Sequence, residues 1–151
     1  MLQAANTYYH FRHVAGFWEW LSIKVQEGTV RTASLVADEI DFPQELVDWV
    51  EEQAAAGFYV DVSRGDIQSK LSEIAAWVVE QPFGAQHIAK FLNGADPWIT
   101  AAAAVDGATV VTQEQPVPYN SKKIKIPNVC RAFGVRCVDT FQMNDELKAS
   151  F

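Results

Sequence analysis

The stretch from Ala95 to Glu114 constrains the fold most, because it combines the patterns of a helix, a tight turn and a buried strand. Asp96-Pro97 is typical of a helix start, since proline has the φ angle of the first turn and the carboxylate can accept from N–H groups there. The small and apolar residues that follow predict a closely packing helix that ends at Asp106-Gly107. Residues 108–112 then form a β-branched run of strand length, and Glu114 follows its carboxyl end.

This order of elements predicts where a ligand would bind. In open α/β sheets, ligands bind just beyond the carboxyl ends of the strands. Glu114 stands at such an end, and Asp96 at the start of the preceding helix could face the same crevice. The sequence therefore makes these two carboxylates candidates for one site.

The rest of the chain alternates helical patterns with short strand-like runs. Apolar residues recur near helical spacing in segments 13–27, 34–40, 43–56, 66–81, 85–92, 128–133 and 141–147. Strand patterns occupy 29–33 and 135–139, residues 58–62 are a strand or an extended link, and 1–5 resemble the tail of a strand. Such alternation predicts an α/β fold with a mostly parallel sheet. A length of 151 residues predicts a single domain over 1–151.

Composition narrows the classes of function. The net charge of −7 argues against a protein that holds nucleic acid by a large basic surface, but it leaves room for an acidic Mg²⁺ site that engages a phosphodiester. No apolar run approaches the ~18 residues of a membrane span, and no signal peptide is recognisable. The two cysteines, Cys130 and Cys137, are expected to be reduced packing thiols in a cytoplasmic protein.

Catalytic motifs of the common kinds are missing from this sequence. We find no dinucleotide-binding or phosphate-binding glycine loop, no G-x-S-x-G and no H-E-x-x-H. The candidates that remain are carboxylates at the ends of elements, namely Glu39, Asp96 and Glu114. Each has a plainer interpretation: Glu39 as a solvated helix end, Asp96 as a helix cap and Glu114 as a loop residue.

Five stretches, 6–21, 36–40, 95–103, 108–114 and 125–139, occur in an order that resembles the PIN-domain family. They span nearly the whole chain, and the likeness is to a bacterial PIN-like branch related to the toxins of toxin–antitoxin pairs. The resemblance implies a three-layer α/β/α sandwich whose mostly parallel central sheet gathers acidic residues at one edge. It also implies Mg²⁺- or Mn²⁺-dependent cleavage of RNA, an antitoxin protein as partner, and a homodimer.

Carried over residue by residue, the resemblance assigns Glu39, Asp96 and Glu114 as the catalytic and metal-holding acids. Thr112 begins the family's T-x-acid motif, which ends at Glu114. The implied chemistry is hydrolysis in which metal ions activate a water and neutralise charge on the phosphate. The family also has an Asp-bearing strand before the equivalent of Asn6. We therefore expect this chain to lack the first acid and to be truncated at its N-terminus relative to the family.

The substrate contacts expected from this resemblance are Asn6, Thr112, Lys122, Lys123 and Lys125. The amide of Asn6 is a poor replacement for a carboxylate ligand. The three lysines follow the strand that bears Glu114, so phosphate contact is one interpretation and a solvated loop is the other.

Two other classes of function stay open. The chain could be an inactive PIN-like module that binds RNA or an antitoxin without cutting, an alternative that the missing acid favours. A nucleotide-binding or small-molecule-binding α/β protein is disfavoured because the sequence has no phosphate loop. Phe17, Trp18 and Trp20 cluster early and could form a partner surface, although core packing explains them more simply.

Overall fold

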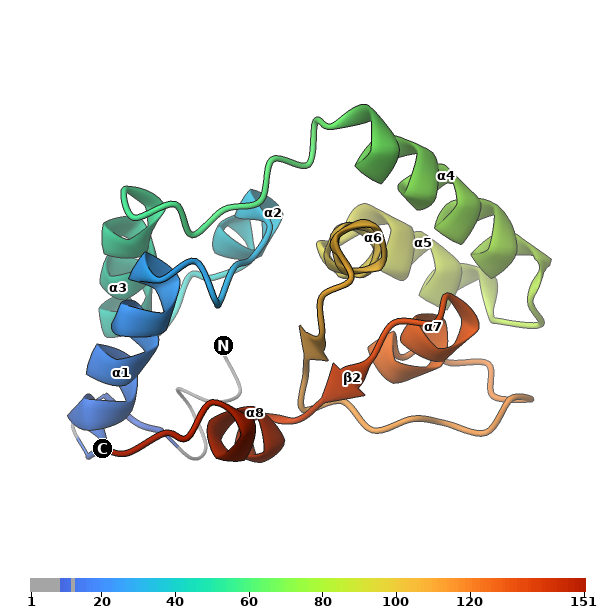
Figure 1. Cartoon of the computed structure of the whole chain (residues 1–151). Coiled ribbons are helices and arrows are strands. Elements are labelled where there is room, and N and C mark those ends of the chain that lie inside the picture. The colour runs from blue at the N-terminus through green and yellow to red at the C-terminus, as the bar shows by residue number, and fades with distance from the viewer. Residues whose placement is uncertain (1–8, 12) are drawn as a thin grey trace. The chain divides into compact units, whose positions relative to one another are not determined.

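The computed structural model describes residues 9–11 and 13–151 of the chain (Figure 1). These residues divide into two compact units. Unit 1 comprises the described residues up to Val60 together with Phe141–Phe151, and unit 2 comprises Asp61–Thr140. The strand tail predicted at residues 1–5 lies outside the described part. The prediction of one domain over 1–151 stays a prediction.

Unit 1 is built from helices. They are α1 (Ala15–Gln26), α2 (Ser34–Asp38), α3 (Gln44–Ala54) and, after the chain returns from unit 2, α8 (Thr140–Glu146), most of which belongs to unit 1. The strands expected at 29–33 and 58–62 reduce to one parallel bridge between Thr32 and Tyr59. Only two backbone hydrogen bonds, Thr32 N–H to the Phe58 carbonyl and Val60 N–H to the Thr32 carbonyl, both 2.8 Å, hold these segments together.

Aromatic side chains fill the core of unit 1. Phe17, Trp18 and Trp20 are 2%, 3% and 9% exposed, so core packing accounts for the early aromatic cluster. Two buried indoles of unit 1 have hydrogen-bond acceptors. The Trp18 indole N–H donates to the Tyr9 carbonyl at 2.7 Å. The Trp49 indole N–H donates to the Ser22 hydroxyl at 2.9 Å. These bonds matter because a buried indole N–H without an acceptor would destabilise the fold.

Unit 2 contains α4 (Gly65–Glu80), α5 (Ala85–Asn93), α6 (Asp96–Asp106), β1 (Val110–Val111), α7 (Ile126–Ala132) and β2 (Cys137–Val138). The two strands pair in parallel, with Val110 opposite Cys137 and Val111 opposite Val138. α7 lies between them in the chain, so β1, α7 and β2 form a βαβ unit (Figure 1). The described part of the chain is thus a helix-rich α/β structure with a small parallel sheet.

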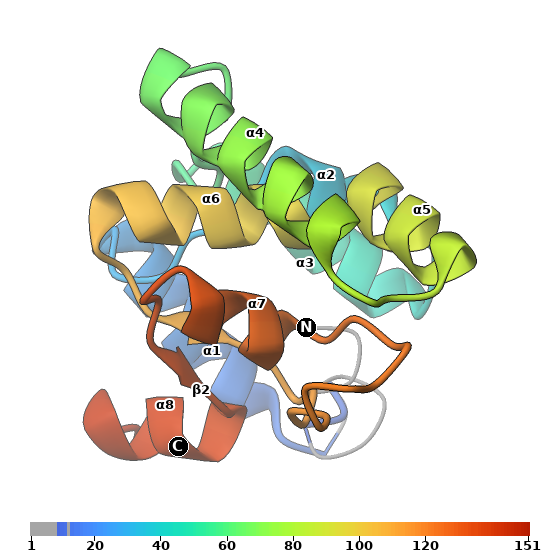
Figure 2. The same ribbon diagram turned by 90° about the vertical axis from the view of Figure 1, so that its right-hand side faces the viewer.

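Small residues explain the packing of α6. Ala101, Ala102 and Ala103 are buried, so the backbone of α6 can approach its neighbours closely. α4 packs on α6 through a face that includes Ile67, Ile74 and Val78, all 0% exposed (Figure 2). On the strand side, Ala103 joins Val110, Ile126, Cys130 and Val135 in one hydrophobic cluster.

The turn from α6 into β1 confirms the predicted helix stop. Gly107 has φ +64°, in the left-handed region where a side chain would be strained. The Ala108 N–H then donates to the Ala103 carbonyl at 2.9 Å. After this turn, Val110 of β1 joins Ala103 of α6 in one hydrophobic cluster, against which Ile99 of α6 also packs. No described helix is long and apolar enough to cross a membrane.

Candidate functional site at the carboxyl end of β1

Thr112 continues the backbone pairing just past the end of β1. Its N–H donates to the Val138 carbonyl at 2.9 Å. Its hydroxyl oxygen accepts from the Glu114 N–H at 3.1 Å. Thr112 therefore fixes the backbone that carries the Glu114 carboxylate out of the sheet, a positioning role within the chain.

The Glu114 carboxylate, which is 29% exposed, has a partner at each oxygen. Oε1 accepts from the Lys125 ammonium at 2.5 Å. Oε2 accepts from the Ile126 N–H, at the first residue of α7, at 2.9 Å. Glu114 thus caps the start of α7 and forms an ion pair with Lys125, two contacts that the sequence pattern did not reveal.

Asp96 begins α6, as predicted, with Pro97 in the first turn. Ile99, in the first turn of α6, packs against the hydrophobic cluster that contains Val110 of β1. One turn into α6, the Thr100 hydroxyl donates to the Asp96 carbonyl at 3.0 Å. Asp96 and Glu114 both belong to unit 2.

A pair of free thiols lies in the same region. Cys130 on α7 is buried, and its thiol forms hydrogen bonds with the side chains of Thr100 and Cys137. Burial raises the pKa of Cys130 to about 12, and the neighbouring Cys137 sulfur adds to the shift. The pKa of Cys137 is also raised, by burial first and in part by the charge of Glu114. The geometry therefore joins α6, α7 and β2 through neutral thiols.

The raised pKa of the Cys130 thiol makes the free energy of unfolding depend on pH. Below an ordinary cysteine pKa of 9.0, both folded and unfolded chains carry a neutral Cys130 thiol. Between 9.0 and about 12, the unfolded chain loses this proton while the folded chain keeps it, so folding weakens as pH rises. The slope attributable to one such group reaches about 1.4 kcal/mol per pH unit.

Urea unfolding of the parent chain and of Cys130→Ala checks this prediction. The difference in unfolding free energy between the two should shrink as pH rises from about 8 to about 10, since only the parent has this proton to lose. A difference that stays constant over this range would contradict the assignment.

The loop between β1 and α7 is held at several points. The Asn128 side chain donates to the Val117 carbonyl at 2.7 Å and accepts from the Val117 N–H at 2.9 Å. Lys122 contacts the turn before α5: its ammonium donates to the Pro82 carbonyl at 3.0 Å and its carbonyl accepts from the Gly84 N–H at 2.9 Å. Lys123 is exposed and has no side-chain partner among the described residues. The three predicted lysines thus have three different environments.

Two of the residues expected from the sequence, Glu39 and Asn6, remain. Glu39 directly follows α2, is exposed and belongs to unit 1. Asn6 lies outside the residues that the structure describes. In the described ranges, no three His, Cys, Asp or Glu side chains gather closely enough to hold a metal ion. The Gln113 amide nitrogen, beside Glu114, is buried with no hydrogen-bond partner among the residues described.

Fold and site together define a class: a helix-rich α/β protein in which a carboxylate, Glu114, follows the first strand of a parallel βαβ unit. A family model described as DUF4411, a domain of unknown function, matches residues 1–151, and the chain belongs to this family. No curated protein and no solved structure matches the chain.

Proposed function

We propose that this protein is a metal-dependent endoribonuclease of the PIN type and acts as the toxin of a toxin–antitoxin pair. The observation that carries the proposal is the placement of two acids in unit 2, where Asp96 begins the helix that leads into β1 and Glu114 follows the carboxyl end of β1. Ligands of α/β sheets bind at this edge. The resemblance in sequence order to PIN domains supplies the reaction, which the geometry alone does not specify.

The proposal has structural and cellular parts. The two-stranded parallel sheet belongs to the central layer of a three-layer α/β/α sandwich. RNA is the substrate, an antitoxin protein and a second copy of the chain are partners, and the protein works in the cytoplasm.

The acids of the site are suited to a hard divalent cation. Carboxylate oxygens are the ligands that Mg²⁺ and Mn²⁺ prefer, and Asp96 and Glu114 of unit 2 would hold the ion. When bound, the ion supplies a more acidic water and positive charge at the phosphate. Thr112 fixes the backbone of Glu114, and Lys125 balances its charge before an ion arrives.

Removing Lys125 should therefore strengthen metal binding. In Lys125→Ala the ion no longer competes with an ammonium for Glu114, and Mg²⁺ affinity should rise about twofold to fivefold, the range of a partly exposed ion pair. Calorimetric titration with Mg²⁺ and Mn²⁺ measures this. Lys70→Ala is the matched control, because Lys70 pairs with Glu73 on α4 and its loss should leave the affinity unchanged. Unchanged or weaker Mg²⁺ binding by Lys125→Ala would contradict a role for Glu114 as a ligand.

Cleavage of a mixed RNA pool tests the function itself. The protein should cut RNA in Mg²⁺ or Mn²⁺, and EDTA should stop the reaction. RNA that stays intact with either metal, at protein concentrations that bind it, would defeat the nuclease proposal.

A specific observation favours a second candidate, a PIN-like module that binds RNA or an antitoxin without cutting. Both Glu114 oxygens are engaged, one by Lys125 and one by the start of α7. A carboxylate with these contacts can serve structure alone. Binding of RNA without cleavage, together with no calorimetric signal from Mg²⁺, would support this candidate.

A further inference from the structure

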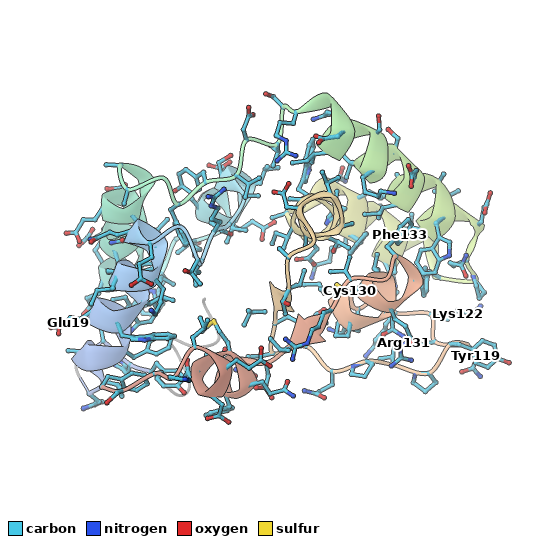
Figure 3. All side chains as sticks on the ribbon, viewed as in Figure 1. Glu19, Tyr119, Lys122, Cys130, Arg131 and Phe133 are labelled. Atoms are coloured by element: carbon cyan, nitrogen blue, oxygen red, sulfur yellow. The ribbon has the colours of Figure 1, made fainter. Side chains whose placement is uncertain are left out.

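Tyr119 is the most exposed large hydrophobic side chain among the described residues. Its exposed fraction is 91%, compared with 68% for Phe42, the next in order. The ring lies at the tip of the loop between β1 and α7, near Lys122 (Figure 3). A tyrosine ring offers a flat apolar face and a polar tip, and tyrosine is enriched at interfaces for this reason.

The loop holds this ring away from the body of unit 2. Val117 is fixed to α7 by two hydrogen bonds with the Asn128 side chain, one in each direction, and Lys122 is fixed to the turn before α5. Between these anchors, the Ser121 N–H donates to the Pro118 carbonyl at 2.9 Å and closes a tight turn around Tyr119. Because folding already orders this loop, binding at its tip costs little further conformational entropy.

The charge around the ring is positive. Residues 115–138 contain five lysines or arginines and no aspartate or glutamate, in a chain whose net charge is −7. Lys123 and Arg131 are exposed and form no ion pair with any described residue. Arg131 lies three residues after Asn128 in α7, so it shares the face that holds Val117 and sits beside the start of the loop (Figure 3).

We infer that the tip of this loop binds single-stranded RNA, with the Tyr119 ring stacked on a base and with Lys123 and Arg131 on the neighbouring phosphates. Stacking aromatics beside unpaired cations are the recurring means of holding single strands, since every base has a π-face. The inference rests on the proposed function for its substrate class. It assigns the contact to Tyr119, Lys123 and Arg131, whereas Lys122 and Lys125 are engaged within the protein.

The test measures binding in EDTA, so that cleavage does not enter. A fluorescein-labelled oligouridine of about 15 nucleotides is the probe, read by fluorescence anisotropy. Tyr119→Ala should weaken binding about 10-fold, whereas Tyr119→Phe, which keeps the ring, should stay within about twofold of the parent. Lys123→Ala should weaken binding and reduce the slope of affinity against salt by about one.

Phe42→Ala is the matched control, because Phe42 is also an exposed ring but lies in unit 1. It should bind the probe as the parent does. The inference is overturned if the parent does not bind the oligouridine, if Tyr119→Ala binds as well as the parent, or if Tyr119→Phe is as weak as Tyr119→Ala. Any of these results would favour a protein partner for the exposed ring.

The two proposals fail separately. Loss of binding in Tyr119→Ala, in a protein that never cuts RNA, would keep this inference and defeat the nuclease proposal. Metal-dependent cleavage by a protein whose Tyr119→Ala variant binds RNA normally would support the nuclease proposal and overturn the inference about Tyr119.

Discussion

Replacing Asp96 by asparagine is expected to lower the rate of RNA cleavage by about 100-fold or more. The substitution keeps the size of the side chain and its ability to accept a hydrogen bond, but it removes the negative charge. If that charge helps to hold a divalent ion, several kcal/mol of stabilisation of the developing phosphate charge are lost with it. The rate at which the mixed RNA pool is cleaved and the Mg²⁺ affinity measured by calorimetry should decline together.

The same helix provides the control. Asp106 is the last residue of α6, and its carboxylate accepts from the Arg64 guanidinium at 2.8 Å. Asp106→Asn removes an equal charge from the opposite end of α6 and should leave cleavage and Mg²⁺ affinity unchanged. Circular dichroism should show both variants folded, since an asparagine at a helix start costs at most about 1 kcal/mol.

A loss of cleavage and of Mg²⁺ affinity in Asp96→Asn, but not in Asp106→Asn, would support a site at the start of α6. Equal losses would instead point to the stability of α6, on which α4 packs. If neither variant loses activity while the parent cuts RNA, Asp96 is a structural residue at the start of a helix. The nuclease reaction would then use other groups.

The helices of this chain could be predicted because their signals are local. The spacing of apolar residues predicted the bounds of α1, α3, α4 and α5 to within a few residues. Gly107 and Gly134, both with positive φ, follow directly after the predicted ends of two other helices. The strands were predicted longer than they are. Strand pairing depends on neighbours distant in sequence, and β1 and β2 pair over only two residues each.

The candidate site was predictable only in outline. Glu114 could be placed after a strand and Asp96 at a helix start, because both positions follow from local pattern. The partners of Glu114 could not be predicted. They depend on the path of a loop that returns to Glu114 eleven residues later, at Lys125. The sequence presented three similar lysines, whereas the structure uses Lys125 in an ion pair, Lys122 as an anchor and Lys123 as an exposed cation. Thr100 and Cys137 had no motif that could have pointed to them.

Replacing Phe58 by alanine is expected to lower the free energy of unfolding by about 3–5 kcal/mol, the cost of removing a large ring from a packed core. Phe58 is 1% exposed in unit 1, and its ring meets Trp49 edge to face at a centroid distance of 5.5 Å. Trp49 in turn packs on Trp18 at 5.1 Å. The cavity would open among stiff aromatic rings, which can collapse into it only partly. Urea unfolding followed by tryptophan fluorescence measures the loss.

A partner variant in unit 2 turns this measurement into a test of the domain prediction. Ile74 is 0% exposed on α4, and Ile74→Ala should cost about 2–5 kcal/mol. If residues 1–151 form one cooperative domain, each variant shifts a single transition that fluorescence and circular dichroism report at the same urea concentration. If Phe58→Ala shifts one transition and Ile74→Ala another, the chain contains two domains. In that case Asp96 and Glu114 share a domain, and Glu39 belongs to a different one.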